Sequence, residues 1–232
     1  MPLSGIEVSL FRLLRPPSYR SLLLNPTNLA SWCAYFAACF GLALVLSWFM
    51  PYLVKALGFS QDEAGKLTAL LFLTGFFVVL LGSWLSENMM KRGYSSRWAR
   101  GSLAGASLCL GGFALLVTIS GALLKIALVF AGTTLPSIVY TLSPAILAEI
   151  TPSSRRGAIL AINSAIGASA GIVAPYIMGS AVESAVSVAD GYQHGFFVCG
   201  IVALVGGVIA IAFLKPKAEM PISTAGVSAL AT

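Results

Sequence analysis

The stretch LTALLFLTGFFVVLLGSWLS, residues 67–86, contains no charged side chain. A helix needs about 20 apolar residues to cross the hydrocarbon core of a bilayer, so this stretch predicts a transmembrane helix. Five more uncharged stretches of comparable length occupy residues 28–54, 101–124, 126–148, 157–182 and 191–214. The strands of a β-barrel would instead show about ten residues of alternating polarity. The sequence therefore predicts an all-α integral membrane protein, a bundle of six transmembrane helices.

The charge content of the whole chain supports this class. Of 232 residues, 14 are Lys or Arg and 8 are Asp or Glu, which makes 9% charged, whereas 58% are hydrophobic. Soluble domains carry about 25% charged residues, which cover their surface. The composition excludes a soluble enzyme and a soluble nucleic-acid-binding protein. We therefore expect no enzyme and no nucleic-acid partner, and membrane lipid as the surroundings.

Two of the stretches, the third and the fourth, are separated only by Lys125. Together they are too long for one helix, and Ser120-Gly121 favours a turn between them. The amino group of Lys125 can then extend to the membrane surface.

The basic residues are unevenly divided between the two sides that six spans define. Because Lys and Arg concentrate in cytoplasmic loops, the excess predicts that both termini are cytoplasmic. Residues 1–27 are then a basic cytoplasmic segment, residues 28–214 the membrane bundle and residues 215–232 a cytoplasmic tail. The eleven inner basic residues are Arg12, Arg15, Arg20, Lys91, Arg92, Arg97, Arg100, Arg155, Arg156, Lys215 and Lys217, and the three outer ones are Lys55, Lys66 and Lys125.

Few side chains could carry out chemistry. The four cysteines lie within the predicted spans without the spacing of a zinc site, and the single histidine, His194, lies at the outer end of the last span. Residues 167–171 match the G-x-S-x-G pattern of serine hydrolases, but in mid-membrane and with no carboxylate nearby. We expect no catalytic residue, no metal and no cofactor.

No Asp, Glu, Lys, Arg or His lies in the middle of a predicted span, so the chain by itself shows no proton relay. Prolines interrupt the first span at Pro51 and the fourth at Pro136 and Pro144. Counted as three helices plus three, these two spans are equivalent, and breaks at equivalent positions indicate the binding cavity of a transporter. A kink that serves packing alone is an equally open alternative.

The fifth stretch combines a polar residue with small ones. The amide of Asn163 must find a partner on a neighbouring helix or face a wet cavity, and both alternatives are open. Gly167 and Gly171 favour close approach of another helix.

Three segments together resemble the major facilitator superfamily. Residues 82–93 resemble its loop signature, with Glu87 where Asp is commoner. Residues 48–60 resemble the seventh helix and following outer loop of its anion:cation symporter group, and residues 156–179 resemble the eleventh helix. The resemblance covers about residues 10–215 and implies the carboxy-terminal half, a 3+3 repeat, of a twelve-helix fold. It also implies that residues 1–27 are the cytoplasmic basic linker that joins the two halves.

The resemblance also implies a function. We expect half of a secondary active transporter for a small organic anion (a sugar acid, aromatic acid or other carboxylate), working by alternating access with proton coupling in a bacterial inner membrane. A second six-helix bundle, either a missing half or another copy, would supply the charged groups. The alternatives are a self-contained homodimeric carrier or pore, and a non-transporting scaffold or truncated gene product.

The same resemblance assigns residues to two sites. A latch at the cytoplasmic side would consist of Glu87, Lys91, Arg92, Arg155 and Arg156. Apart from the resemblance, Arg155 and Arg156 lie just across the turn from Glu149 and can offset its unfavourable position at a helix end. The expected substrate contacts are Trp48, Tyr52, Tyr140, Ser143 and Asn163.

Overall fold

The structure is a computed structural model and describes residues 19–117 and 121–215. Within these ranges the chain has six helices that are long and apolar enough to cross a membrane, which confirms the predicted number. A short helix α2 (Tyr19–Leu23) precedes them. The six spans are α3 (Pro26–Leu44) continued by η1 (Val45–Phe49) and α4 (Met50–Lys55), α5 (Gln61–Lys91), η2 (Arg97–Ser102) continued by α6 (Leu103–Leu116), α7 (Ala122–Thr134) continued by η3 (Leu135–Ile138) and α8 (Val139–Ile150), α9 (Ser153–Ser184), and α10 (Val188–Phe213).

The third span is shorter than predicted. Helix α6 ends at Leu116 and α7 begins at Ala122, so residues 122–124 belong to the fourth span and not to the third. Gly121 has a φ angle of 110°, at which any residue with a Cβ would be strained. The predicted turn is therefore confirmed at Gly121, while Ser120 lies outside the described residues.

Near Pro51 and Pro136 the first and fourth spans change to π-helical and 3₁₀-helical hydrogen bonding while the helix continues, and we call these two segments, η1 and η3, the helix breaks. Pro51 follows the π-helical segment η1, and Pro136 lies within the 3₁₀ segment η3. Proline removes a backbone donor and crowds the carbonyl four residues earlier, so the helix changes its hydrogen-bonding pattern there. Pro144 does not break its helix, because α8 continues through it.

Helix α5 begins at a well-defined cap. The Oγ atom of Ser60 accepts a hydrogen bond from the backbone N–H of Glu63, and Glu63 Oε2 accepts one from the backbone N–H of Ser60 over 2.9 Å. These two bonds satisfy donors that a helix start leaves free. They separate α5 sharply from α4.

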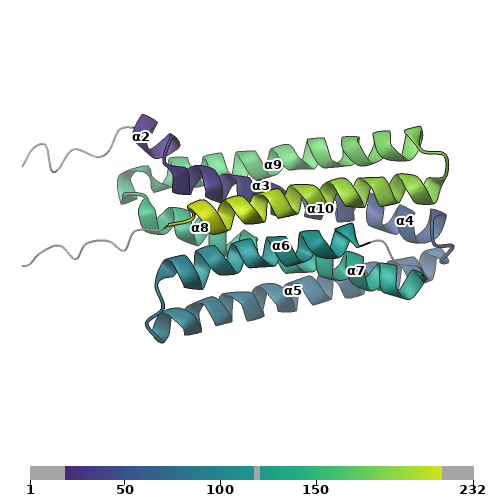
Figure 1. The fold of residues 1–232 in the computed structure, drawn as a ribbon, viewed down its shortest axis with the longest axis horizontal. Coiled ribbons are helices and arrows are strands. Elements are labelled where there is room, and N and C mark those ends of the chain that lie inside the picture. Colours follow the sequence, from purple (N-terminus) through teal and green to yellow (C-terminus); the bar gives the residue numbers. More distant parts are fainter. Residues whose placement is uncertain (1–18, 118–120, 216–232) are drawn as a thin grey trace, which may run out of the picture.

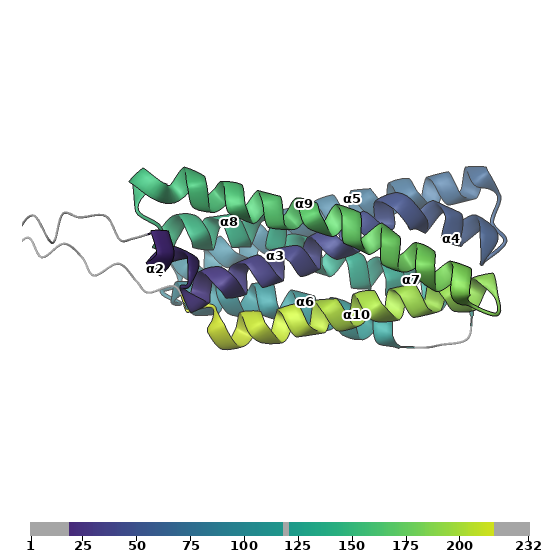
Figure 2. The same cartoon turned by 90° about the horizontal axis from the view of Figure 1, so that it is seen from above.

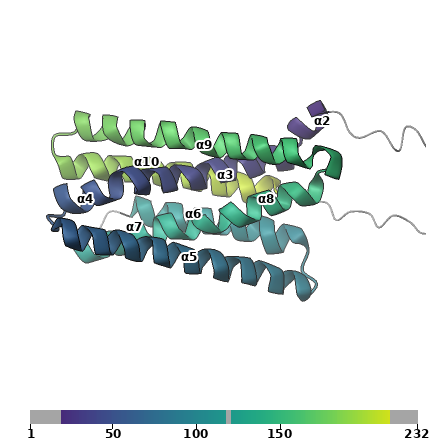
Figure 3. The same cartoon turned by 180° about the vertical axis from the view of Figure 1, so that it is seen from behind.

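The helices form two layers. Figure 1 shows α6 and α10 side by side on one face, and Figure 3 shows the opposite face, with α3, α4, α7 and α8 between α9 and α5. Helices α6 and α10 approach through glycines. A Cβ on Gly112 would lie 2.7 Å from the carbonyl oxygen of Gly200, and one on Gly207 would lie 2.8 Å from that of Gly105. Backbone therefore lies directly against backbone in this pair.

Both described chain ends lie at the same end of the bundle (Figure 2). We call this the terminal end; it also holds the α5–α6 and α8–α9 connections. The distal end is the other one, with the α4–α5, α6–α7 and α9–α10 connections. Residues of the predicted linker and tail lie mostly outside the described ranges.

Candidate functional site

A groove of about 280 Å³ lies between α3, α5 and the fourth span. Both helix breaks reach it, since Val45 belongs to η1 and Ser137 to η3. Tyr140 is the one predicted substrate contact that lines it. The described residues of its wall are Leu42, Val45, Leu71, Phe72, Gly75, Phe76, Val79, Thr133, Thr134, Ser137 and Tyr140, none of them charged.

The polar atoms of this wall already have partners. The hydroxyl of Tyr140 donates a hydrogen bond to the carbonyl oxygen of Ala38 over 3.0 Å, and its ring lies edge-on to Tyr35. The hydroxyls of Thr133 and Ser137 donate to the carbonyl oxygens of Val129 and Thr134, one turn earlier in the same span. The groove is therefore an apolar surface with internally satisfied hydroxyls, and charged recognition groups for an anion must come from outside it.

Ser143 and Asn163, two further predicted contacts, meet in a buried chain of hydrogen bonds. The Ser143 hydroxyl donates to Oδ1 of Asn163 over 3.1 Å, and Ser31 Oγ lies 2.8 Å from Ser143 Oγ. Since Ser143 has one hydroxyl proton, Ser31 is the donor in the second bond. These hydrogen bonds join α3, α8 and α9. Asn163 is 1% exposed, so its amide bonds to a neighbouring helix and does not face one of the described cavities.

Trp48 and Tyr52 lie near the distal end in an aromatic cluster. The Trp48 ring contacts Tyr192 with the centroids 6.0 Å apart, and Tyr52 contacts Tyr192 at 5.4 Å and Phe196 at 5.0 Å. Trp48 also packs against Gly179 of α9. These rings join the first span to α9 and α10.

The five predicted substrate contacts therefore have separate surroundings. Asn163 and Gly179 lie on the same helix, sixteen residues apart. At 1.5 Å per residue this places the Ser143–Asn163 pair about 24 Å along the axis from the Trp48 contact. One small ligand does not touch both groups in this conformation. As substrate contacts, all five residues stay a prediction.

The predicted latch residues lie at the terminal end. Glu87, Lys91 and Arg92 are exposed and, within the described ranges, take part in neither of the two ion pairs found. Arg155 stacks on the ring of Tyr19 at 4.0 Å from its centroid. The Arg156 side chain reaches the carbonyl oxygen of Thr151 at 3.5 Å. Their role in a latch stays a prediction.

Glu149 does not pair with Arg155 or Arg156, contrary to expectation. Its Oε2 atom accepts from Arg100 Nη1 over 2.8 Å and from the Ser96 hydroxyl over 2.7 Å. Those partners come from the start of the third span, across the bundle. The position of Glu149 at the carboxyl end of a helix indicates that it needs a cation, but no sequence spacing identifies Arg100 as that cation. The sequence likewise gave no signal that Ser31 would hydrogen-bond to Ser143.

In the part of the chain that the structure describes, no cluster of His, Cys, Asp or Glu side chains could hold a metal ion. The arrangement offers an apolar groove, helix breaks and interhelical hydrogen bonds. These are features suited to binding and conformational change.

Six helices long and apolar enough to cross a membrane define a multi-pass membrane protein. The profile of the Major Facilitator Superfamily matches residues 13–229, and the chain belongs to this superfamily. The resemblance identified from the sequence motifs is thereby confirmed.

Curated relatives of this chain are named as sugar-acid transporters. The chain is 24% identical over 209 residues to a hexuronate transporter of Bacillus subtilis (strain 168), covering 87% of the chain and 48% of that protein. It is 26% identical over 189 residues to a D-galactonate transporter of Escherichia coli O6:H1, covering 80% of the chain and 42% of that protein. The chain thus spans about half the length of the curated relatives it matches.

Solved structures show the same fold. A D-xylose-proton symporter matches with a TM-score of 0.61 and 16% identity, over 92% of this chain and 52% of that one. This confirms that the six helices form half of a major facilitator fold.

Proposed function

We propose that this chain forms one half of a secondary active transporter for a small organic anion of the sugar-acid class, working by alternating access with proton coupling. The observation that carries the proposal is the groove that both helix breaks reach, because broken helices at equivalent repeat positions line transporter cavities. The names of the relatives support the substrate class.

A second six-helix bundle would complete the cavity. Helices α5 and α9 are the least buried of the six, and they flank the face that contains the broken spans (Figure 3). The exposed surface of α9 is rich in small side chains, which let a second protein helix approach more closely than large ones do. They include Ala161, Ser164, Ala165, Ala168, Ser169 and Gly171.

The second bundle would also supply the charges. No described residue of the groove wall is an Asp, Glu, Lys, Arg or His, so neither the anion nor a coupling proton finds a charged counter-group there. Tyr140, which lines the groove, is the residue of this half that we assign to contact with the substrate. Glu87, Lys91 and Arg92 are exposed at the terminal end and available to pair with such a partner.

The decisive experiment joins the chain to a partner bundle. We would fuse it behind the amino-terminal half of the E. coli D-galactonate transporter and measure uptake of radiolabelled galactonate into liposomes under an inward proton gradient. We expect uptake by the fusion and none by the chain alone. Tyr140→Leu should reduce uptake at unchanged protein abundance, whereas Tyr94→Leu, an exposed tyrosine at the terminal end, should not. Saturable, gradient-driven uptake by the chain alone would favour a self-contained carrier instead.

A further inference from the structure

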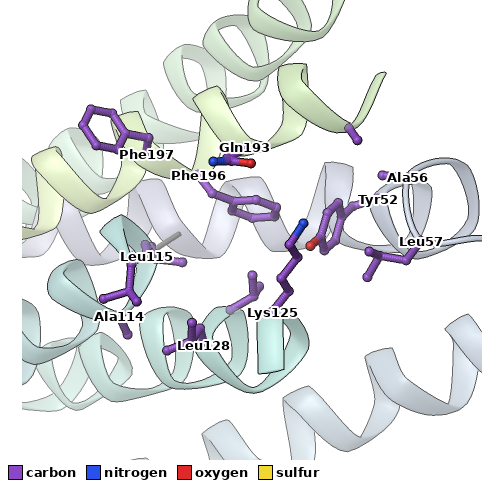
Figure 4. A pocket seen from close by; sticks show the side chains of 13 residues that line it. Tyr52, Ala56, Leu57, Ala114, Leu115, Lys125, Leu128, Gln193, Phe196 and Phe197 are labelled. Atoms are coloured by element: carbon purple, nitrogen blue, oxygen red, sulfur yellow. The ribbon is translucent and has the colours of Figure 1, made fainter. Parts of the chain in front are cut away.

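A second cavity, separate from the groove, lies at the distal end between α4, α6, α7 and α10 (Figure 4). Its volume is about 80 Å³, and its walls are mostly apolar. Since a water molecule takes up about 30 Å³ of liquid, the space corresponds to two or three waters or to one small headgroup. Leu115, Leu128 and Phe196 are among its apolar residues.

Three polar side chains line this cavity, those of Lys125, Tyr52 and Gln193. Lys125, near the start of α7, extends its amino group toward the ring end of Tyr52, which reaches in from α4 (Figure 4). Lys125 is half-buried and Tyr52 is 6% exposed.

The cavity lacks a counter-charge. Among the described residues, no Asp or Glu lines it, and Lys125 is in no ion pair. Asp190, in the first turn of nearby α10, accepts instead from the hydroxyl of Ser187 over 2.6 Å. Because Lys125 is only partly exposed, its ammonium is less hydrated than that of a fully exposed lysine and attracts an anion more strongly.

The walls also define what the anion carries. Apart from Lys125, Tyr52 and the amide of Gln193, the walls are apolar, so most hydroxyls of a sugar acid would lie against leucine, phenylalanine, valine or alanine side chains without a partner. An aromatic ring or alkyl chain would gain from the same contact. The chemistry of this cavity therefore differs from that of the proposed transport substrate.

We propose that the distal cavity binds the head of an apolar monocarboxylate, with the carboxylate on the ammonium of Lys125 and the hydroxyl of Tyr52, and with the apolar body extending out of the cavity past Leu128 and Phe196. The same chemistry can come from a water-soluble aromatic acid or from a fatty acid dissolved in the membrane. The site is independent of the sugar-acid pathway, and it assigns Tyr52 to a ligand other than the transported anion.

Binding is tested with the whole chain in phosphatidylcholine nanodiscs, using radiolabelled benzoate and, separately, radiolabelled laurate, each corrected with empty discs. We expect saturable binding that Lys125→Gln weakens by about tenfold or more, as loss of a charge-assisted hydrogen bond should. Lys125→Arg should restore most of it, and Tyr52→Phe should weaken it about fivefold. The matched control is Lys55→Gln, an exposed lysine at the same end, which should bind as wild type.

The two probes distinguish the sources. Benzoate binding identifies an aqueous acid as the ligand, and binding of laurate alone identifies a membrane acid; either supports the site. Absence of saturable binding by both probes overturns the proposal, and so does equal binding by Lys125→Gln. If Lys125→Gln fails to fold, Leu128→Trp, which fills the cavity, takes its place and should abolish binding. Competition by galactonate would also contradict the proposal, because it would make this cavity part of the sugar-acid pathway.

Discussion

Arg100 and Glu149, which lie forty-nine residues apart in the sequence, form an ion pair with Nη1 and Oε2 separated by 2.8 Å. The pair joins η2, at the start of the third span, to the last turn of α8. Each side chain is 23% exposed, so the pair is neither fully solvated nor fully buried. It links the two three-helix repeats at the terminal end and neutralises a carboxylate that its own helix end disfavours.

Arg100→Gln should therefore destabilise the bundle. We expect a loss of about 1–2 kcal/mol, between the values typical of exposed and buried pairs, because Glu149 would lose its cation at a helix carboxyl end. The measurement is the midpoint temperature of thermal unfolding, with the folded protein that remains after heating quantified by size-exclusion chromatography. The exchanged double variant, Arg100→Glu with Glu149→Arg, should recover part of the loss. Equal stability of Arg100→Gln and wild type would show that the pair contributes nothing.

Gly112→Ala should disrupt the contact between α6 and α10. Its Cβ would lie 2.7 Å from the Gly200 carbonyl oxygen, and backbone cannot give way as a flexible side chain can. We expect a cost of about 1–3 kcal/mol, measured as lower thermal stability and lower yield of folded protein. Gly171→Ala is the matched control: no atom lies within 4 Å of its Cβ position, and alanine favours a helix over glycine, so stability should hold or rise slightly. A similar loss in both variants would rule out this explanation.

Asn163 and Ser143 should show energetic coupling. Single and double variants, Asn163→Leu and Ser143→Ala, form a cycle whose interaction term isolates the hydrogen bond. We expect about 0.6–1.7 kcal/mol, the range for polar contacts between membrane helices. In the galactonate fusion, Asn163→Leu tests the predicted substrate contact directly. Normal uptake by that variant would leave Asn163 as a packing residue.

The orientation of the bundle can be tested by cysteine labelling. In a chain whose four native cysteines are replaced by alanine, Tyr94→Cys reports on the terminal end and Val186→Cys on the distal end; both positions are exposed. Because the basic residues concentrate at the terminal end, we expect an impermeant maleimide added to intact cells to label Cys at position 186 and spare position 94. The reverse pattern would invert the predicted topology.

Much of the fold could be predicted from the sequence because it depends on properties that add up along a continuous stretch. Twenty uncharged residues at 67–86 form a membrane helix whatever their neighbours are. The breaks at Pro51 and Pro136 follow from a missing donor and a local clash, and the turn at Gly121 from a φ angle that glycine readily adopts. The end of the third span was predicted less well. Residues 122–124 are uncharged and apolar, so their composition does not show whether they belong to the third span or to the fourth.

The candidate sites depend on contacts between helices, which only the tertiary structure decides. Sequence distance favoured Arg155 and Arg156 as partners of Glu149, yet the rotation and packing of the helices bring Arg100 to it instead. The predicted substrate contacts lie on the first and fourth spans and on α9, but Trp48 and Asn163 lie at different positions along the bundle axis and do not meet. Lys125 and Tyr52 come from different repeats, and they share a cavity because α4, α6, α7 and α10 meet at the distal end. Hydrophobicity and backbone chemistry thus determined that this chain crosses the membrane six times and where its helices break. Which side chains meet was decided by how closely, and at what rotation, those helices pack.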